Sequence, residues 1–310
     1  MIVSIRNSEL MSQDAAGLTA IMSATTAIAK SKKTLVIQLT PANEISVLNI
    51  LYGKVLKEQD ISSVYRKYED NGLDALFLRA ETTDLTTEHF NECVTPLFDK
   101  ENLLDVLKPT KQLDYKKIIN LDNLRDILTS AQETYDYVYI YIPFDDAEIC
   151  EKVKELTDDD IVVVPQGIKK DVMPEDTVVV MNFDYESKFD MKYMKKLYNK
   201  KEIYHIPYNI EYKDSYISEN ILNFILRNKK DMKTDNNYSF SSSILALITK
   251  YVVGNNVEDD EEEEFEKKEQ KNHNVTYDPL KEISGDSVQE VTVKKGLFKK
   301  EKKLMINTNK

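Results

Sequence analysis

Residues Met1-Ile2-Val3-Ser4-Ile5 form an apolar run that is too short for a helix and rich in β-branched side chains, which predicts a buried strand. A polar loop over 6–14 follows, and the Ala-, Ile- and Leu-rich segment 15–29 has the spacing of a helix. The run 34–39 (TLVIQL) predicts a second strand. Strand, helix and strand in this order indicate a βαβ crossover in a parallel sheet. We expect the two strands to lie side by side and to run in the same direction.

A ligand of this architecture normally binds where the first strand meets the first helix. Glycines let the backbone wrap an anion there, and the helix N-terminus supplies free amides. A phosphate loop adds a Lys for the phosphates and a Ser or Thr for Mg²⁺. Residues 7–19 contain one glycine, no lysine and two acids, Glu9 and Asp14, which would repel a triphosphate. The stretch therefore has the framework of a phosphate-binding unit without its chemistry.

At this point the chain resembles the ParA/MinD-type ATPases, the P-loop proteins that position plasmids, division sites, pili and other cargo. Their pattern is a strand, a K-G-G-V-G-K-T-T loop, a helix, and a second strand that ends in a D-L-D-P-Q-like sequence. Residues 24–41 (ATTAIAKSKKTLVIQLTP) fit the end of this pattern without a gap, and the loop then falls on residues 12–19.

In this alignment the charged and hydroxylic residues of the loop are replaced. Gly17 stands in place of the phosphate-binding lysine, Leu18 in place of the magnesium-binding Thr, and Ser12 in place of the extra signature lysine. In the second strand Gln38 and Thr40 stand where the family has aspartates. The resemblance implies a degenerate nucleotide site, without catalytic residues, at Ser12, Gln13, Asp14, Gly17, Leu18, Thr19 and Asn182.

Three later segments extend the resemblance to about residue 253. Residues 135–143 (YDYVYIYIP) are similar to the family's Y-D-Y-V-I-I-D-T-P, with Tyr141 where the family has the aspartate of the magnesium shell. Residues 180–184 are similar to V-x-N-x-x-D, which places Asn182 at the adenine base; an Asn that simply favours a turn is the alternative. Residues 206–209 resemble I-P-Y-N. Asp145 and Asp146 are either displaced metal ligands or the N-terminal acids of the next helix.

The remaining pattern predicts an α/β fold, a doubly wound and mostly parallel sheet with helices on both faces, over residues 1–253. Continuous apolar runs at 160–165 and 177–182 indicate strands that are covered on both faces. We predict further strands at 73–79, 118–119 and 202–209, and further helices at 43–56, 60–68, 86–98, 101–107, 121–133, 147–156, 191–199, 218–227 and 241–253.

Beyond the α/β domain we predict an acidic disordered linker over 254–290 and a basic tail over 291–310. In the tail, apolar pairs seven residues apart accompany the lysines of the segment from Lys294 to Lys303. On a helix these pairs would share one side and could lie on an anionic membrane surface. A solvated tail or a peptide that docks on a partner is the alternative interpretation.

Composition limits the function classes. The formal charge of −12 argues against nucleic-acid binding by the main domain, because phosphate contacts need clustered Lys and Arg. Two widely separated cysteines, no apolar run near eighteen residues and no signal-peptide pattern favour a reduced, cytoplasmic protein, with peripheral attachment to the membrane left open. No His or Cys spacing indicates a metal site, and we interpret His205 as structural.

We therefore predict a non-catalytic ParA/MinD-like scaffold, without a cofactor, that positions or assembles a pilus, secretion or conjugation machine through protein partners. One alternative is a divergent ATP-binding partition or positioning ATPase, homodimeric, with a substitute cation that is either Arg6 or a Lys supplied by a second subunit. Another is a peripheral membrane adaptor that uses the basic tail.

Overall fold

The fold is seen in a computed structural model that describes residues 1–8, 13–39, 46–58, 72–83, 85–97, 103–110, 120–142, 147–228 and 238–252. The predictions for 60–68, 118–119, 254–290 and 291–310, as well as Ser12, Thr40, Asp145 and Asp146, lie outside these residues. No helix in the part of the chain that is described is both long and apolar enough to cross a membrane.

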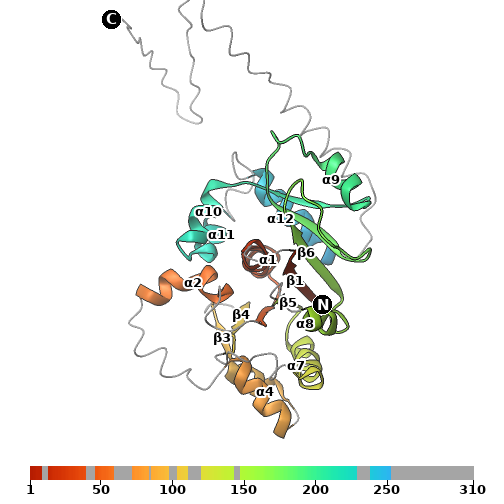
Figure 1. Cartoon of the computed structure of the whole chain (residues 1–310). Helices are drawn as coiled ribbons and strands as arrows, with labels where there is room; N and C mark the ends of the chain where they lie inside the picture. The colour runs from red at the N-terminus through yellow and green to blue at the C-terminus, as the bar shows by residue number, and fades with distance from the viewer. Residues whose placement is uncertain are drawn as a thin grey trace, which may run out of the picture. The chain divides into compact units, whose positions relative to one another are not determined.

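Within the described residues, eight strands form one sheet in the order β3-β4-β2-β5-β1-β6-β7-β8. Figure 1 labels β1, β3, β4, β5 and β6 of this sheet. The strands are β1 Ile2–Asn7, β2 Thr34–Gln38, β3 Val94–Pro96, β4 Leu104–Leu107, β5 Tyr137–Ile142, β6 Asp159–Val164, β7 Thr177–Phe183 and β8 Tyr204–Pro207. Neighbouring strands are parallel except for β3 and β4, which pair antiparallel. The chain winds from β1 toward β4 on one side and toward β8 on the other, which confirms the predicted doubly wound sheet.

The first two strands run in the same direction, but they are not neighbours. β5 lies between β1 and β2 and pairs with both, so the expectation that they lie side by side was wrong. The reason is that the chain leaves a gap beside β1 when it crosses to β2. The later apolar strand β5 fills this gap, with Tyr139 fully buried. β5 and β6 thus flank β1 at the centre of the sheet.

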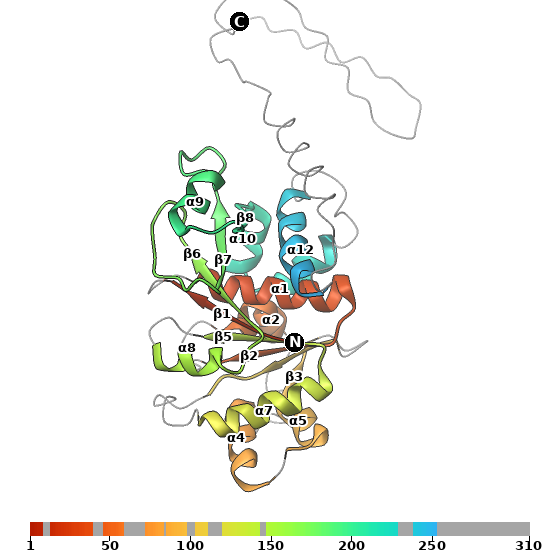
Figure 2. The ribbon, with the colours of Figure 1, turned by 90° about the vertical axis from the view of Figure 1, so that its right-hand side faces the viewer.

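Helices cover both faces of the sheet. They are α1 Asp14–Lys30, α2 Val47–Glu58, α4 Leu73–Thr82, α5 Thr87–Cys93, α7 Leu121–Thr134, α8 Ala147–Lys154, α9 Met191–Tyr198, α10 Ile210–Ile217, α11 Ile221–Asn228 and α12 Tyr238–Val252. One core packs α1, α2, α11 and α12 on the face that Val3 and Ile5 point to, and two others pack α4, α5, α7, α8 and α9 on the opposite face. Figure 2 shows α1 and α12 on one side of the sheet and α4, α5 and α7 on the other.

The first helix is the centre of the larger core. Every residue from Ala15 to Ile28 is buried, because α2, α11 and α12 all contact α1 on the side away from the sheet. Its small side chains allow this close packing, and Ser31 ends the helix in the left-handed conformation with φ 52°. The predicted helix over 15–29 is thus confirmed to within one residue at each end.

Two predicted elements have the wrong type. The stretch 73–79 was predicted as a strand but forms α4, in which the buried Leu73, Leu76 and Phe77 follow the three-and-four spacing of a helix. The stretch 101–107 was predicted as a helix, but Leu104–Leu107 is the strand β4, buried at every position and paired with β2. A short apolar run that is buried on both faces has no periodicity that distinguishes the two structures.

Two helical boundaries also differ from the prediction. The helix expected over 86–98 ends at Cys93, because Val94 begins β3 and pairs with Leu107. The helix expected over 218–227 is preceded by α10, which we did not predict. Asn209 begins α10 by accepting a hydrogen bond from the Tyr212 amide at 2.8 Å.

Candidate functional site

The candidate site lies at the carboxyl edge of the sheet, where β1 leads to α1. Gln13 and Asp14 stand at the start of α1, and Asn182 comes to them from the end of β7. The Asn182 side-chain amide donates a hydrogen bond to Asp14 Oδ1 at 3.1 Å. Asp14 and Asn182, which are 168 positions apart in the sequence, are thus brought together.

The backbone of this site is helical from Asp14 onward. Since α1 begins at Asp14, the positions aligned with most of the phosphate loop belong to the helix. The Gly17 amide donates to the Gln13 carbonyl at 3.1 Å, and the Ala15 amide donates to Asn7 Oδ1 at 2.8 Å. These amides are engaged with the protein itself, whereas anion binding at a helix N-terminus depends on amides that point at the ligand.

Two tyrosines of α10 pack against Gly17. A Cβ atom at this glycine would overlap the Tyr212 hydroxyl and would lie 3.2 Å from a ring carbon of Tyr216. The Tyr216 hydroxyl donates to Gln13 Oε1 at 3.0 Å. Burial raises the pKa of both tyrosines, with Asp14 as a further cause in each case, so both stay neutral. Neutral rings therefore lie beside Gly17, which the sequence resemblance aligns with the family's lysine.

The next two loop positions point into the protein. Leu18 is fully buried in the larger core. The Thr19 hydroxyl is also buried and donates to the Ala15 carbonyl at 2.7 Å, one helical turn back. Neither side chain faces the carboxyl edge, which follows from the covering of α1 on all sides.

Tyr141 is buried at the carboxyl end of β5 and belongs to the larger core. The same core contains Tyr212 of α10, and Tyr216 packs against it. The residue that the sequence resemblance aligns with the family's magnesium-shell aspartate is thus part of this core.

Asn182 has a backbone role besides its hydrogen bond. It is exposed, its φ is 55°, and the pairing of β7 with β8 shifts register between Val180 and Phe183. Asn is among the few residues that adopt this left-handed conformation at low cost. Its presence at this strand end is therefore explained by the bulge.

Sequence reasoning missed three residues of the site: Asn7, Tyr212 and Tyr216. Asn7 was treated as part of a polar loop, although it is the last residue of β1 and reaches the Ala15 amide. Tyr212 and Tyr216 are four residues apart, the spacing of one helix face. That spacing was the available signal, but it depends on recognising α10.

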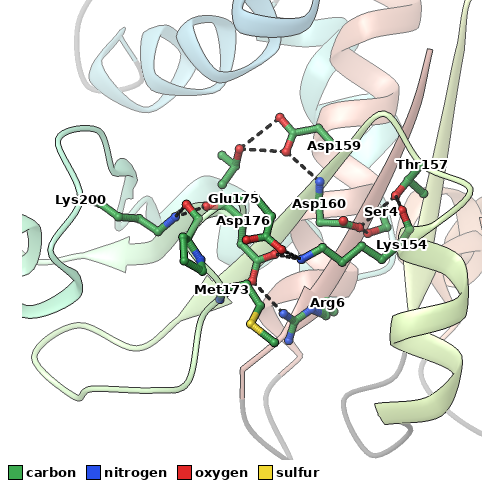
Figure 3. A network of polar contacts seen from close by, with 12 residues as sticks. Ser4, Arg6, Lys154, Thr157, Asp159, Asp160, Met173, Glu175, Asp176 and Lys200 are labelled. Carbon is green, nitrogen blue, oxygen red and sulfur yellow. Dashed lines mark hydrogen bonds and ion pairs between the residues drawn. The ribbon is translucent and has the colours of Figure 1, made fainter.

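A second polar cluster lies at the amino ends of β6 and β7, and Figure 3 shows it without its member Lys250. We call it the amino-edge network; its members are Ser4, Arg6, Lys154, Thr157, Asp159, Asp160, Glu175, Asp176, Thr177, Lys200 and Lys250. Its centre is Asp176, whose side chain is fully buried. Asp176 pairs with Arg6 at 3.0 Å and with Lys154 at 2.8 Å, and it accepts from the Met173 amide at 2.9 Å.

The rest of the network joins elements from both faces of the sheet. Ser4 and Thr157 donate to Asp160, and burial raises the pKa of this carboxyl group. Lys250 of α12 pairs with Asp159 at 2.7 Å on the other face. Arg6 pairs with Asp176 at the amino edge. It is therefore not the substitute cation that the hypothesis of a divergent ATPase required at the carboxyl edge.

The described residues contain no group of three or more His, Cys, Asp or Glu side chains placed to hold a metal ion. His205 lies in β8, its Nε2 is 2.9 Å from the Tyr185 hydroxyl, and its ring packs near Phe183. Burial lowers the pKa of His205 to about 4, with Lys195 as a second cause, so the ring is neutral near pH 7. This geometry is that of a structural histidine.

The sequence matches no family model, and no curated protein matches it. The fold, however, is shared with solved structures. A ParA family ATPase from Chlorobium tepidum TLS superposes with a TM-score of 0.60 at 12% identity, over 80% of this chain and 98% of that one. A chain of the MinC:MinD cell division protein complex from Aquifex aeolicus gives 0.56 at 14% identity, over 83% and 97%.

The septum site-determining protein MinD from Pyrococcus horikoshii OT3, complexed with Mg-ADP, gives a TM-score of 0.53 at 12% identity, over 82% of this chain and 98% of that one. The sheet and its helices thus place the chain in the class of α/β proteins with a P-loop NTPase fold. Within this class it has the fold of the ParA/MinD-type ATPases, as the sequence resemblance implied.

Proposed function

We propose that this chain is a non-catalytic ParA/MinD-like protein that positions or assembles a larger machine, such as a pilus, secretion or conjugation apparatus, through protein contacts. The observation that carries the proposal is the packing of Tyr212 and Tyr216 against Gly17, at the position of the family's lysine. A lysine side chain would have to displace a tyrosine that is itself buried among Phe224 and Phe240.

The chemistry of phosphoryl transfer supports this proposal. The transfer is catalysed almost entirely by positioning and by the neutralisation of charge with Lys and Mg²⁺. At the carboxyl edge the corresponding positions are Gly17, Leu18 and Tyr141, while Asp14 adds a negative charge at the start of α1. The Ala15 amide is already satisfied by Asn7. These residues do not fit a magnesium-bound triphosphate.

The outer surface of α10 supports a function through protein contacts. Tyr212 and Tyr216 point inward, whereas Ile210 and Ile217 are 63% and 69% exposed on the same helix. Tyr208, just before the helix, is also exposed. Large apolar side chains that gather beside a site are typical of protein-binding surfaces. The helix that closes the carboxyl edge therefore also presents a surface for a partner.

A thermal-shift titration of the full chain with ATP and ADP, with and without Mg²⁺, tests the proposal. We expect no change in melting temperature at millimolar nucleotide and no magnesium-dependent phosphate release. A ligand present at 100 times its Kd would stabilise the fold by about 2.7 kcal/mol, which is readily detected. A magnesium-dependent stabilisation that disappears in Asn182→Ala would contradict the proposal.

That contradicting result would favour a divergent ATP-binding protein, the second candidate. The contact between Asn182 and Asp14 at the carboxyl edge is the observation in its favour, together with the Mg-ADP complex of the Pyrococcus relative. This candidate requires cations from a second copy of the chain, so ATP should increase the mass seen in light scattering. Under our proposal the mass is the same with and without nucleotide.

A further inference from the structure

The outer side of α10 is apolar although it faces water. The helix contacts α11 and α2 (Figure 1), and its inward tyrosines pack against Gly17 of α1. Ile210 and Ile217 lie on the outer side, and Ile217 is the most exposed large apolar side chain among the described residues. Apolar surface in water costs free energy, and a protein contact that covers it recovers this cost.

The helical geometry of α10 places a charge on each side of these isoleucines. A helix turns about 100° per residue, so Ile210 and Ile217 project within about 20° of each other and form one line along the helix. Lys213 projects about 50° to one side of this line, and Asp214 projects about 50° to the other side. Both charged residues are exposed. The outer side of α10 thus has an apolar centre, one basic flank and one acidic flank.

The basic flank also has an apolar part. Lys213 Nζ lies 5.5 Å from the centroid of the Tyr208 ring, a cation–π distance. Tyr208 is itself exposed just before the helix begins. The ring therefore holds the ammonium group beside the line of isoleucines and widens the apolar surface that a partner can cover.

The two flanks are complementary to each other when the helix is doubled by a two-fold axis that runs parallel to it. Such an axis brings the two lines of isoleucines together and exchanges the flanks. Lys213 of each copy then faces Asp214 of the other copy, so each dimer has two opposite-charge contacts. An antiparallel pair would place Lys213 opposite Lys213 and Asp214 opposite Asp214, which is unfavourable.

We propose that a second copy of this chain binds the outer side of α10, with the two helices parallel about a two-fold axis. Closed two-fold dimers are the commonest homo-oligomers, and they require a surface that is complementary to itself. This inference rests on the proposed function, in which α10 serves protein contacts, and it names the partner of that surface. The contact residues are outside the site at the start of α1, so the dimer needs no nucleotide.

Sedimentation velocity of the full chain without nucleotide tests the proposal. One face of a short helix is smaller than a standard interface of about 1,600 Å², so we expect a reversible dimer with a Kd of about 10 to 100 µM. Protein concentrations from about 2 to about 500 µM bracket this range. The sedimentation coefficient should rise over the series from that of a monomer toward that of a dimer.

Matched variants separate the α10 contact from general apolar association. Ile210→Ser/Ile217→Ser should raise the Kd at least about tenfold, because four apolar side chains leave each dimer. Serine and isoleucine have similar helix propensities, so the melting temperature of the monomer should change little. The control Ile168→Ser/Met173→Ser removes two exposed apolar side chains outside α10 and should leave the Kd unchanged.

Charge variants test the parallel orientation. Lys213→Asp makes both flanks acidic and should raise the Kd about threefold or more, since two opposite-charge contacts become like-charge contacts. Lys213→Asp/Asp214→Lys exchanges the flanks and should return the Kd to that of the wild type. An antiparallel pair would be insensitive to Lys213→Asp, because one like-charge contact would replace another.

A monomer at every concentration would overturn this inference but not the proposed function, which the thermal-shift titration with nucleotide tests separately. A dimer that forms only with ATP and Mg²⁺ would overturn both. Equal weakening by the two serine variants would overturn the inference as well, because it would show association through any apolar surface. A Kd that Lys213→Asp does not raise, or that the exchanged variant does not restore, would overturn the parallel arrangement.

Discussion

The two edges of the sheet use polar side chains differently. At the amino edge, four carboxylates (Asp159, Asp160, Glu175 and Asp176) are combined with Arg6, Lys154 and Lys250. Their contacts join α8, α12, β1, β6 and the segment just before β7, and Figure 3 shows those around Asp176. At the carboxyl edge, where this architecture normally binds its ligand, neutral tyrosine rings pack against α1.

This difference indicates what the charges of the chain do. Charged groups at the carboxyl edge of such a sheet normally serve a ligand, whereas those at the amino edge hold the fold together. Here the dense network is at the amino edge, which favours a protein that depends on a stable shape more than on a charged site. Substitutions at one edge at a time distinguish whether its side chains act by packing, by charge pairing or by binding a ligand.

The largest effect is expected from Asp176→Ala. The substitution leaves Arg6 and Lys154 without their common buried partner and should lower the free energy of unfolding by about 3 kcal/mol. This loss of stability is at the low end of the range for broken buried ion pairs, because both cations are partly exposed. Urea unfolding measures the change.

Glu175→Gln is the matched control, since this exposed acid pairs with the same Lys154 and its loss should have no measurable effect. Equal losses would show that burial of Asp176 is unimportant.

The next effect concerns the tyrosine packing at the carboxyl edge. Gly17→Ala should lower the free energy of unfolding by about 1 kcal/mol, because overpacking of about 2 kcal/mol exceeds the gain of about 1 kcal/mol from Ala in a helix. Tyr212→Phe removes the overlapping hydroxyl. The double variant should therefore be at least as stable as the wild type in urea unfolding, while Tyr212→Phe alone changes little.

A stabilised Gly17→Ala single variant would contradict this packing. It would mean that Tyr212 moves aside at little cost and that a longer side chain, such as the family's lysine, could be accommodated. The double-mutant cycle of Gly17→Ala and Tyr212→Phe thus tests the packing of Tyr212 against Gly17, on which the proposed function depends, without any nucleotide measurement.

The sequence predicts the sheet and most helices because their residues have one clear periodicity each. It fails at 73–79 and 101–107, where short apolar runs are compatible with both structures until their tertiary neighbours are known. The position of β5 between β1 and β2 also depends on long-range pairing, which the local sequence does not encode.

For the site, the sequence predicts which residues are missing but not what replaces them. Gly17 and Asn182 lie at one edge of the sheet because of their positions after β1 and at the end of β7. Tyr212 and Tyr216 come from a helix about 200 residues later, and only its packing on α1 brings them to Gly17. A missing charge is visible in an alignment, whereas the ring that fills its place is visible only in three dimensions.

A smaller effect is expected at Asn182, where the left-handed backbone and the hydrogen bond to Asp14 can be separated. Asn182→Ala should lower the free energy of unfolding by about 1 kcal/mol, because alanine adopts a positive φ at a cost. Asn182→Gly also loses the exposed hydrogen bond but not the backbone freedom, so it should be close to the wild type in urea unfolding. Equal losses in both variants would assign the role to the side chain and strengthen the case for a binding function.

The smallest effect is a change in pH dependence at Asp160. Burial raises the pKa of this carboxyl group in the folded protein, although its hydrogen bonds with Ser4 and Thr157 act in the opposite direction. The folded state therefore holds the proton to a higher pH than the unfolded state, whose pKa is about 4. Stability from this group is present at low pH and is lost as the pH rises through the folded pKa.

Asp160→Asn removes this titration, so the wild type should lose stability relative to the variant from about pH 4 upward until the folded carboxyl group is ionised. Urea unfolding of both proteins over a series of pH values measures the difference. Thr157→Val is the informative companion, because it removes a hydrogen bond that lowers the pKa of Asp160 and should move the loss to higher pH. Parallel curves for all three proteins would show that Asp160 is as well stabilised in the folded state as in water. The charged groups of the amino edge would then be ionised in the folded protein at no cost in free energy. The difference between this charged edge and the neutral carboxyl edge would be larger than the burial of Asp160 suggests.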